Sequence, residues 1–262
     1  MLRSPLMNVM VAAVLKAGKG LKRDFGELEN LQVSTKGPGD FVSIADKKAE
    51  RTLHQELEKA RPGYGFVMEE AGVVEGADKT HRWHIDPLDG TTNFLHGMPF
   101  FATSVALERE GVLVAGVVYN PATEDLFVAE RGKGAFHNDR RMRVSGRRLM
   151  EDSLVGMGLM HLGHGHQGAN IADLGAVLGH VAGARNLGSI AMELAYVASG
   201  RLDGLASRWL KSWDLAAGIV LVREAGGFVS DIRGGDTMLE TGDIVAGNEA
   251  IHKGLLGALA KA

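Results

Sequence analysis

The chain has 262 residues, of which 45% are hydrophobic and 23% charged, and a formal net charge of −3. This composition excludes a disordered or collagen-like chain, and the even spread of Lys and Arg argues against a dedicated nucleic-acid binder. The absence of cysteine excludes disulfides, thiolate metal sites and a thiol nucleophile. No apolar run reaches the ~18 residues of a membrane helix and the first residues lack a secretory signal, so we expect a cytoplasmic protein without a membrane partner.

Two helices are predicted near the N-terminus. Ser4 and Pro5 are typical of an N-cap followed by the first helical residue, and apolar residues then recur at helical spacing as far as Leu21. A second helix is predicted over residues 43–60, because a Pro-Gly pair follows it. Between the two helices, the Gly- and Pro-containing segment 33–40 is interpreted as an exposed loop.

From about residue 64 the apolar residues follow the spacing of strands instead. Strands are predicted at residues 65–68, 83–85, 103–108, 112–119 and 125–129, with turns at 109–111 and 138–139. The second half alternates between the two types of element. Its predicted strands are residues 154–156, 186–187, 203–206 and 228–232, and its predicted helices are residues 168–181, 189–199 and 214–225.

This order of elements predicts an α/β fold of layered helices and sheets. No Pro/Ser-rich linker or internal repeat divides the chain. We therefore expect a single domain over residues 1–262, with subdomains of about 1–145 and 146–262 that share a face.

The most informative motif is Asp-Pro-Leu-Asp-Gly-Thr-Thr at residues 86–92, directly after an apolar strand. The turn at proline allows Asp86, Asp89 and the Leu88 carbonyl to converge, and these oxygen ligands suit Mg²⁺. The backbone amides of Gly90 and Thr91 form a potential anion nest. The same residue types also favour a plain turn, but the Gly-Thr-Thr extension favours a functional site.

Other acidic residues have a structural and a functional interpretation. Glu69 follows an apolar strand and is either a solvated edge residue or a further metal ligand. Asp214 begins an apolar helix, where a carboxylate also stabilises the helix dipole. Asp46 is compatible with a capping box that starts at Ser43.

Taken together, Lys36, Asp46, Glu69, residues 86–91 and Trp213-Asp214 resemble, in order and spacing, the signature of the inositol monophosphatase family. The resemblance extends from the first helix to about Asn248. It implies the αβαβα sandwich of the inositol monophosphatase and fructose-1,6-bisphosphatase type. It also implies a phosphoric monoester hydrolase with two or three Mg²⁺ ions, lithium sensitivity and a homodimer.

The resemblance further implies a role for each matching residue. It identifies as metal ligands Glu69, Asp86, Leu88, Asp89 and Asp214. It assigns catalytic roles to Asp46, Thr91, Glu69 and Lys36, of which Asp46 and Thr91 orient or deprotonate the attacking water. It places the substrate against Asp89, Gly90, Thr91, Ser189, Ile190, Ser207 and Asp214.

One position departs from the family pattern. Ser207 stands where inositol-processing relatives carry a glutamate that hydrogen-bonds sugar hydroxyls. The change either alters specificity or is compensated by Arg208 or a water. The leading substrate is inositol-1-phosphate, and the alternatives are fructose-1,6-bisphosphate, histidinol phosphate and 3′-phosphoadenosine 5′-phosphate.

Histidines and arginines supply the remaining candidates. The His-rich segment 160–166 is interpreted as an exposed loop in preference to a transition-metal site. His84 and His96 flank the acidic motif, and we expect supporting or core roles for them. The basic run over residues 140–148 predicts a solvated hairpin face. As an alternative of another class, this run binds RNA or a protein in a regulatory role with vestigial phosphatase activity.

Overall fold

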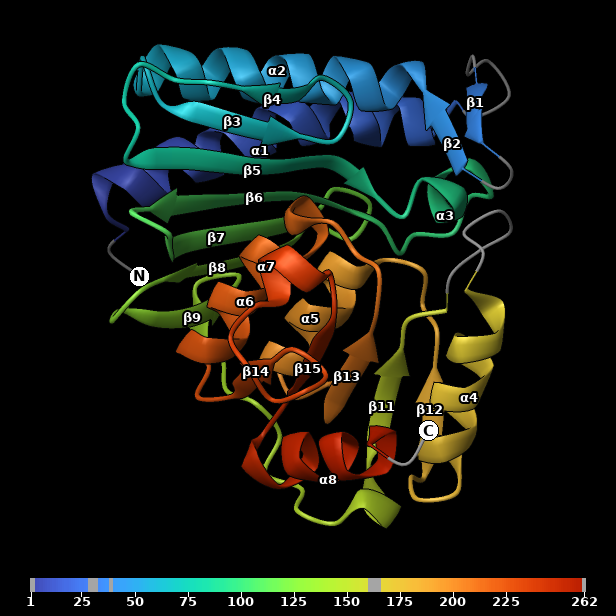
Figure 1. Cartoon of the computed structure of the whole chain (residues 1–262). Coiled ribbons are helices and arrows are strands. Elements are labelled where there is room, and N and C mark those ends of the chain that lie inside the picture. The colour runs from blue at the N-terminus through green and yellow to red at the C-terminus, as the bar shows by residue number, and fades with distance from the viewer. Residues whose placement is uncertain (1–2, 28–32, 38–39, 160–165, 261–262) are drawn as a thin grey trace.

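The computed structural model describes residues 3–27, 33–37, 40–159 and 166–260, and these residues form five layers (Figure 1). Helices α1 (Pro5–Phe25) and α2 (Ile44–Ala60) cover the outer face of an eight-stranded sheet. Helices α5 (Ile190–Ala198) and α6 (Ser212–Glu224) lie between this sheet and a five-stranded sheet. Helices α4 (Gln167–Leu178) and α8 (Glu249–Leu259) form the last layer. This arrangement confirms the predicted αβαβα sandwich.

The eight-stranded sheet has the order β10-β9-β8-β7-β6-β5-β3-β4. Its strands are β3 (Gly65–Met68), β4 (Gly72–Val74), β5 (His81–Asp89), β6 (Ala102–Arg109), β7 (Val112–Asn120), β8 (Asp125–Glu130), β9 (Gly134–His137) and β10 (Arg140–Arg141). All neighbours pair antiparallel except β3 and β5, which are parallel. The parallel pair matters for the site, because the carboxyl ends of β3 and β5 meet at the same edge of the sheet.

The five-stranded sheet has the order β12-β11-β13-β15-β14. Its strands are β11 (Leu154–Met157), β12 (Gly183–Arg185), β13 (Gly204–Ser207), β14 (Phe228–Ser230) and β15 (Ile244–Gly247). The predicted strand at residues 186–187 is wrong, because β12 ends at Arg185 and a loop follows. Among the described residues, three short helices complete the fold: α3 (Thr91–Leu95), α7 (Met238–Thr241) and the 3₁₀ helix Met150–Asp152.

The predicted loop at residues 33–40 is also wrong. Strands β1 (Val33–Gly37) and β2 (Asp40–Ser43) pair antiparallel, so this segment forms a hairpin that leads into α2. Its β-branched and aromatic residues favour extended backbone, which outweighs the loop signal of glycine and proline. The predicted turns hold, since Asn138 and Asp139 have φ of 44° and 64° between β9 and β10. Most of the His-rich segment, residues 160–165, lies outside the described residues.

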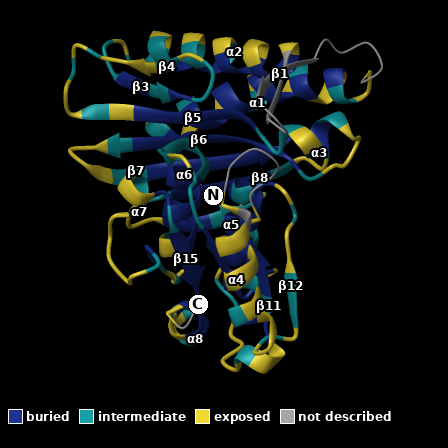
Figure 2. Ribbon diagram, turned by 45° about the vertical axis from the view of Figure 1, so that its right-hand side comes forward, coloured by how far each residue is buried: buried dark blue, intermediate teal, exposed yellow. Residues whose placement is uncertain are grey.

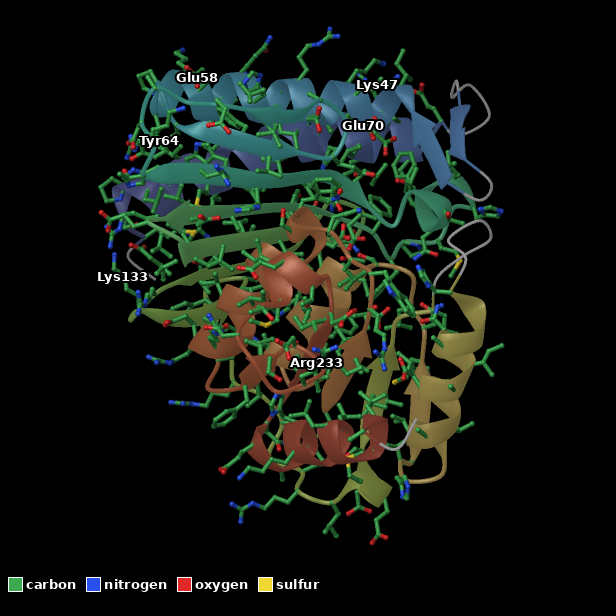
Figure 3. All side chains as sticks on the ribbon, in the orientation of Figure 1. Lys47, Glu58, Tyr64, Glu70, Lys133 and Arg233 are labelled. Carbon is green, nitrogen blue, oxygen red and sulfur yellow. The ribbon has the colours of Figure 1, made fainter. Side chains whose placement is uncertain are left out.

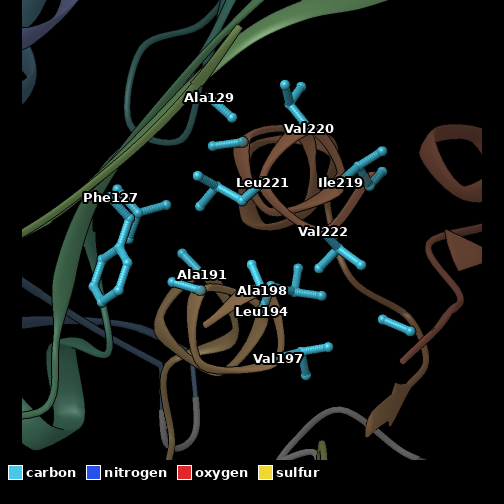
Figure 4. Packing of buried hydrophobic residues seen from close by; sticks show 14 of the residues in the cluster. Phe127, Ala129, Ala191, Leu194, Val197, Ala198, Ile219, Val220, Leu221 and Val222 are labelled. Atoms are coloured by element: carbon cyan, nitrogen blue, oxygen red, sulfur yellow. The ribbon is translucent and has the colours of Figure 1, made fainter. Parts of the chain in front are cut away.

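Two hydrophobic clusters fix the central layers. One packs α1 and α2 against Trp83, Ile85 and their neighbours on the outer face of the sheet. The other packs α5 against α6 and both against Phe127 and Ala129 (Figure 4). The central strands of both sheets and helices α5 and α6 are mostly buried, while exposed residues follow the outer faces of α2 and α4 (Figure 2). Among the described residues no helix is long and apolar enough to cross a membrane.

Close packing places α6 directly on the sheet. A side chain at Gly116 on β7 would lie 2.6 Å from the carbonyl oxygen of Ala217, so glycine is required for this approach. The predicted helix began at residue 214, but α6 starts two residues earlier at Ser212. The N-terminal turn of α6, with Asp214 as the third residue, contacts β5 and β6.

Candidate functional site

Four acidic residues from three elements meet at the edge of the eight-stranded sheet. Asp86 and Asp89 belong to the end of β5, and Asp214 to the first turn of α6. Glu69 directly follows β3, and its amide donates to the Ile85 carbonyl at 3.2 Å. Its neighbour Glu70 lies beside α2 (Figure 3), and the Glu70 amide donates to a carboxylate oxygen of Glu50 on α2 at 2.8 Å.

A break in strand pairing brings the acids of β5 together. The register between β5 and β6 shifts between Asp86 and Asp89, at Pro87. The backbone then folds back locally, and the Leu88 amide donates to Oδ1 of Asp86 at 2.9 Å. Leu88 itself is buried. The sequence predicted this convergence from proline, and the structure shows it as a bulge within a longer strand.

The acids raise one another's pKa. Burial and the charges of Glu69, Asp89 and Asp214 raise the pKa of Asp86 well above its ordinary value. Burial likewise raises the pKa of Asp89 to about 6, and burial with the charge of Asp89 raises that of Asp214 to about 8. Within the described part of the chain, no Lys, Arg or His forms an ion pair with Asp86, Asp89 or Asp214. The cluster therefore concentrates negative charge that only protons or a cation can neutralise.

This donor set suits a hard divalent cation, because all its members are oxygen ligands and the local charge is strongly negative. Asp86 shares hydrogen bonds with Glu69 and Asp214. Among the residues that the structure describes, no group of three or more acidic or histidine side chains is already arranged to hold a metal ion.

Thr91 connects the acidic cluster to α2. Its hydroxyl lies 3.1 Å from Oδ1 of the buried Asp46 and 3.0 Å from the Leu88 carbonyl oxygen, and it can donate to either. Gly90, with φ of 91°, turns the chain from β5 into α3. A β-carbon at this position would lie 3.1 Å from the Gly188 carbonyl oxygen. The left-handed turn and the close approach both require glycine here.

The segment before α5 contacts Asp89. The Ser189 hydroxyl donates to Oδ2 of Asp89 at 2.6 Å, the Ala191 amide donates at 2.7 Å, and the Ile190 amide also bonds Asp89. Ser189 and Ile190, expected to contact substrate, are thus bonded directly to a member of the acidic cluster.

Two residues that sequence reasoning missed hold this segment in place. Asn93 Nδ2 donates to the carbonyl oxygens of Leu187 and Phe100, each at 2.7 Å. Glu193 is buried on α5 and accepts from the amides of Leu187 and Gly188 at 2.9 and 3.2 Å, and burial raises its pKa to about 7. A single acid within the apolar helix segment was a usable signal for Glu193.

Ser207 ends β13 and is 6% exposed, and its hydroxyl has no hydrogen-bond partner among the described residues. It packs against the backbone of Gly158, where any side chain would collide. Arg208 is engaged elsewhere, since it forms a two-pronged ion pair with Asp173 of α4 at 2.5 and 2.8 Å. The expectation that Arg208 compensates for the missing glutamate is therefore not supported by its contacts.

The remaining predicted residues fall into three groups. Lys36 lies in β1, and its side chain lies outside the described residues. His84 is buried, as expected, but His96 is exposed at the end of α3, where its Nδ1 lies 2.8 Å from the Thr92 carbonyl oxygen, so a core role for it is wrong. The arginines of the β9–β10 hairpin, Arg140 and Arg141, are exposed as predicted.

Comparison with known proteins decides the family. The model of the inositol monophosphatase family matches residues 2–262. The chain belongs to the inositol monophosphatase family. A relative named inositol-1-monophosphatase from Mesorhizobium japonicum is 60% identical over 261 residues, which cover 100% of this chain and 98% of the relative. This confirms the predicted enzyme class, a phosphoric monoester hydrolase, and the family implies a divalent metal cofactor.

Other members of the inositol monophosphatase family carry a different name. The solved structure of the extragenic suppressor protein suhB from Bartonella henselae has a TM-score of 0.96 and 55% identity, and covers 99% of this chain and 100% of that chain. A relative named Nus factor SuhB from Pseudomonas aeruginosa is 42% identical over 258 residues, 96% of this chain and 94% of the relative.

Proposed function

We propose that this protein is a Mg²⁺-dependent phosphomonoesterase that hydrolyses a small phosphorylated polyol, with inositol-1-phosphate as its leading substrate. The observation that carries the proposal is the meeting of Glu69, Asp86, Asp89 and Asp214 at one sheet edge, next to the Thr91–Asp46 pair. The close relatives named inositol-1-monophosphatase support the substrate.

In this proposal two or three Mg²⁺ ions are held by Glu69, Asp86, the Leu88 carbonyl, Asp89 and Asp214. When bound, such ions lower the pKa of the attacking water and neutralise the leaving alkoxide. Lithium inhibition is expected, because a small hard cation competes for the same carboxylates.

The protein's own groups orient the nucleophile and the substrate. The Thr91 hydroxyl and Asp46 carboxylate, 3.1 Å apart, form a relay that can orient a water and take up its proton. The Gly90 and Thr91 amides hold the phosphate, and Ser189 and Ile190 fix Asp89 on the opposite side. Lys36 contributes positive charge from the hairpin that precedes α2.

Ser207 makes the substrate the open part of the proposal. We expect inositol-1-phosphate to have a higher kcat/KM than fructose-1,6-bisphosphate, histidinol phosphate and 3′-phosphoadenosine 5′-phosphate, measured as phosphate release with Mg²⁺. Because the Ser207 hydroxyl is buried, Ser207→Ala should leave this order unchanged. A kcat/KM ten times higher for another ester would contradict inositol-1-phosphate as the substrate and would leave the proposed hydrolysis mechanism in place.

A second function is favoured by the relatives named Nus factor SuhB and by the exposed arginines of the β9–β10 hairpin. We propose that this hairpin binds RNA or a protein partner as a secondary role. This role would be supported if binding of RNA or of a protein partner is lost when Arg140→Ala and Arg141→Ala are combined but is retained in Asp89→Asn. Equal binding by both variants would contradict it.

The wider organisation is proposed on the same basis. We propose a cytoplasmic homodimer in which residues 1–262 form one domain with subdomains of about 1–145 and 146–262. Light scattering after size exclusion should give twice the 27.9 kDa chain mass.

A further inference from the structure

A buried histidine joins strand β5, which carries Asp86 and Asp89, to helix α6, which carries Asp214. His84 on β5 is 4% exposed, and its Nδ1 lies 3.0 Å from the Ser212 hydroxyl, the first residue of α6. Its Nε2 lies 2.8 Å from a carboxylate oxygen of Glu108 on β6. This bond lowers the pKa of Glu108, and the three side chains form a hydrogen-bonded chain from sheet to helix.

The spacing of these residues repeats that of the proposed metal ligands. His84 and Asp86 are two residues apart on β5, so both face α6, while Trp83 and Ile85 face α1 and α2. On α6, Ser212 and Asp214 are also two residues apart. The His84–Ser212 bond therefore holds the same helical turn that carries Asp214, whose carboxyl group interacts with that of Asp86.

A third contact docks the same turn of the helix. The Ser104 hydroxyl of β6 donates to the Trp213 carbonyl oxygen at 3.3 Å, and Ser104 lies directly opposite Asp86 in the sheet. The N-terminal turn of α6 is thus held by one bond from each of two adjacent strands, at the two residues that precede Asp214.

The chain Ser212–His84–Glu108 is not arranged as a nucleophilic triad. In such a triad Nε2 faces the serine and Nδ1 faces the acid, whereas here Nδ1 faces Ser212 and Nε2 faces Glu108. The histidine is enclosed between the sheet and α6. The arrangement suits a fixed support.

We propose that His84 is a positioning residue that sets the distance between Asp214 and Asp86 by clamping Ser212. This inference rests on the proposed function, in which those two carboxylates share the cations. Supporting groups of this kind alter metal affinity by about 10- to 100-fold when they are removed. The clamp should therefore govern cation affinity while adding little to contacts with the substrate.

Mn²⁺ binding, followed by the electron paramagnetic resonance signal of the free ion, tests the clamp without any turnover. The variants are His84→Ala, Ser212→Ala and the double variant. The matched control is His252→Ala, because His252 is also buried and bonds a serine, Ser230, at 2.9 Å in the five-stranded sheet. Thermal unfolding in EDTA separates lost stability from lost affinity.

We expect each single variant to weaken Mn²⁺ binding by roughly tenfold and the double variant to be no weaker than His84→Ala, because both remove the same bond. His252→Ala should lose stability and keep its Mn²⁺ affinity. Should His84→Ala not fold, Ser212→Ala decides on its own. If the folded variants bind Mn²⁺ with the affinity of the wild type, the proposed role of His84 is wrong and the proposed function stands. If the wild-type protein binds no Mn²⁺, the proposed function is wrong as well.

Discussion

Replacing Asp214 by asparagine should stabilise the metal-free protein at alkaline pH while abolishing phosphatase activity. Asp214 has its pKa raised to about 8, chiefly by burial and by the charge of Asp89. The Lys211 amide donates to its Oδ2 at 2.7 Å, a bond that an asparagine oxygen can still accept. The substitution therefore removes the charge and keeps the local hydrogen bond.

The sign of the pH dependence follows from the raised pKa. Because the folded protein holds this proton more tightly than the unfolded chain, stability is lost as pH rises from the ordinary value of 3.8 towards 8. A shift of this size corresponds to at most about 6 kcal/mol at about 1.4 kcal/mol per unit. Since the neighbouring carboxylates share protons, we expect a gain of about 2 kcal/mol, or about 4–8 °C in Tm.

Thermal unfolding in EDTA between pH 5 and pH 9 measures this gain. The control is Asp236→Asn, whose carboxylate is 77% exposed and paired with Arg223, so its Tm difference should be small and flat with pH. For Asp214→Asn the difference should be largest at pH 8 and above and shrink to about a third at pH 5. Mg²⁺ should raise the Tm of the wild type more than that of the variant.

A lower stability of Asp214→Asn than of the wild type at pH 8 in EDTA would show that the charge of Asp214 does not destabilise the folded protein. A gain of equal size at pH 5 and pH 8 would also contradict this effect of the charge, because a packing effect does not follow the titration of a carboxyl group.

Three substitutions at the turn after β5 probe separate parts of the site. Thr91→Val should lower kcat by roughly 10²–10⁴-fold with little change in Tm, whereas Thr91→Ser should retain most activity; phosphate release shows whether the hydroxyl matters. Gly90→Ala should cost about 1–2 kcal/mol, since φ is 91°, and unchanged urea unfolding would refute the strain. Asn93→Ala leaves the carbonyl oxygens of Phe100 and Leu187 without this donor and should lower the free energy of unfolding by about 1–3 kcal/mol. An unfolding curve like that of the wild type would count against the supporting role of Asn93.

Local patterns in the sequence carried much of the fold. The N-cap at Ser4 accepts from the Met7 amide at 3.1 Å, and α1 begins at Pro5 as predicted. Strand β3 matches its predicted bounds because it is a short apolar run with clear ends. Strand β15 and helix α8 were not predicted, although Asn248 caps α8 through two amides.

The site was predictable where it depends on contiguous motifs and unpredictable where it depends on tertiary contacts. The acids at residues 86 and 89 lie in one motif, so their proximity follows from the chain itself. The contacts of His84 with Glu108 and Ser212 span 24 and 128 residues, and only the sheet register and the docking of α6 bring them together. The predicted helix began at residue 214, which left Ser212 outside it, so the contact of Ser212 with β5 could not be anticipated.

The central claim is that the acidic cluster supports metal-dependent cleavage of a phosphate ester. Phosphate release from inositol-1-phosphate, measured in EDTA and then with added Mg²⁺ for the wild type and Asp86→Asn, tests it most directly. We expect turnover by the wild type only when Mg²⁺ is present, and a loss of turnover in Asp86→Asn. Equal phosphate release in EDTA and Mg²⁺, or wild-type turnover by Asp86→Asn, would contradict it.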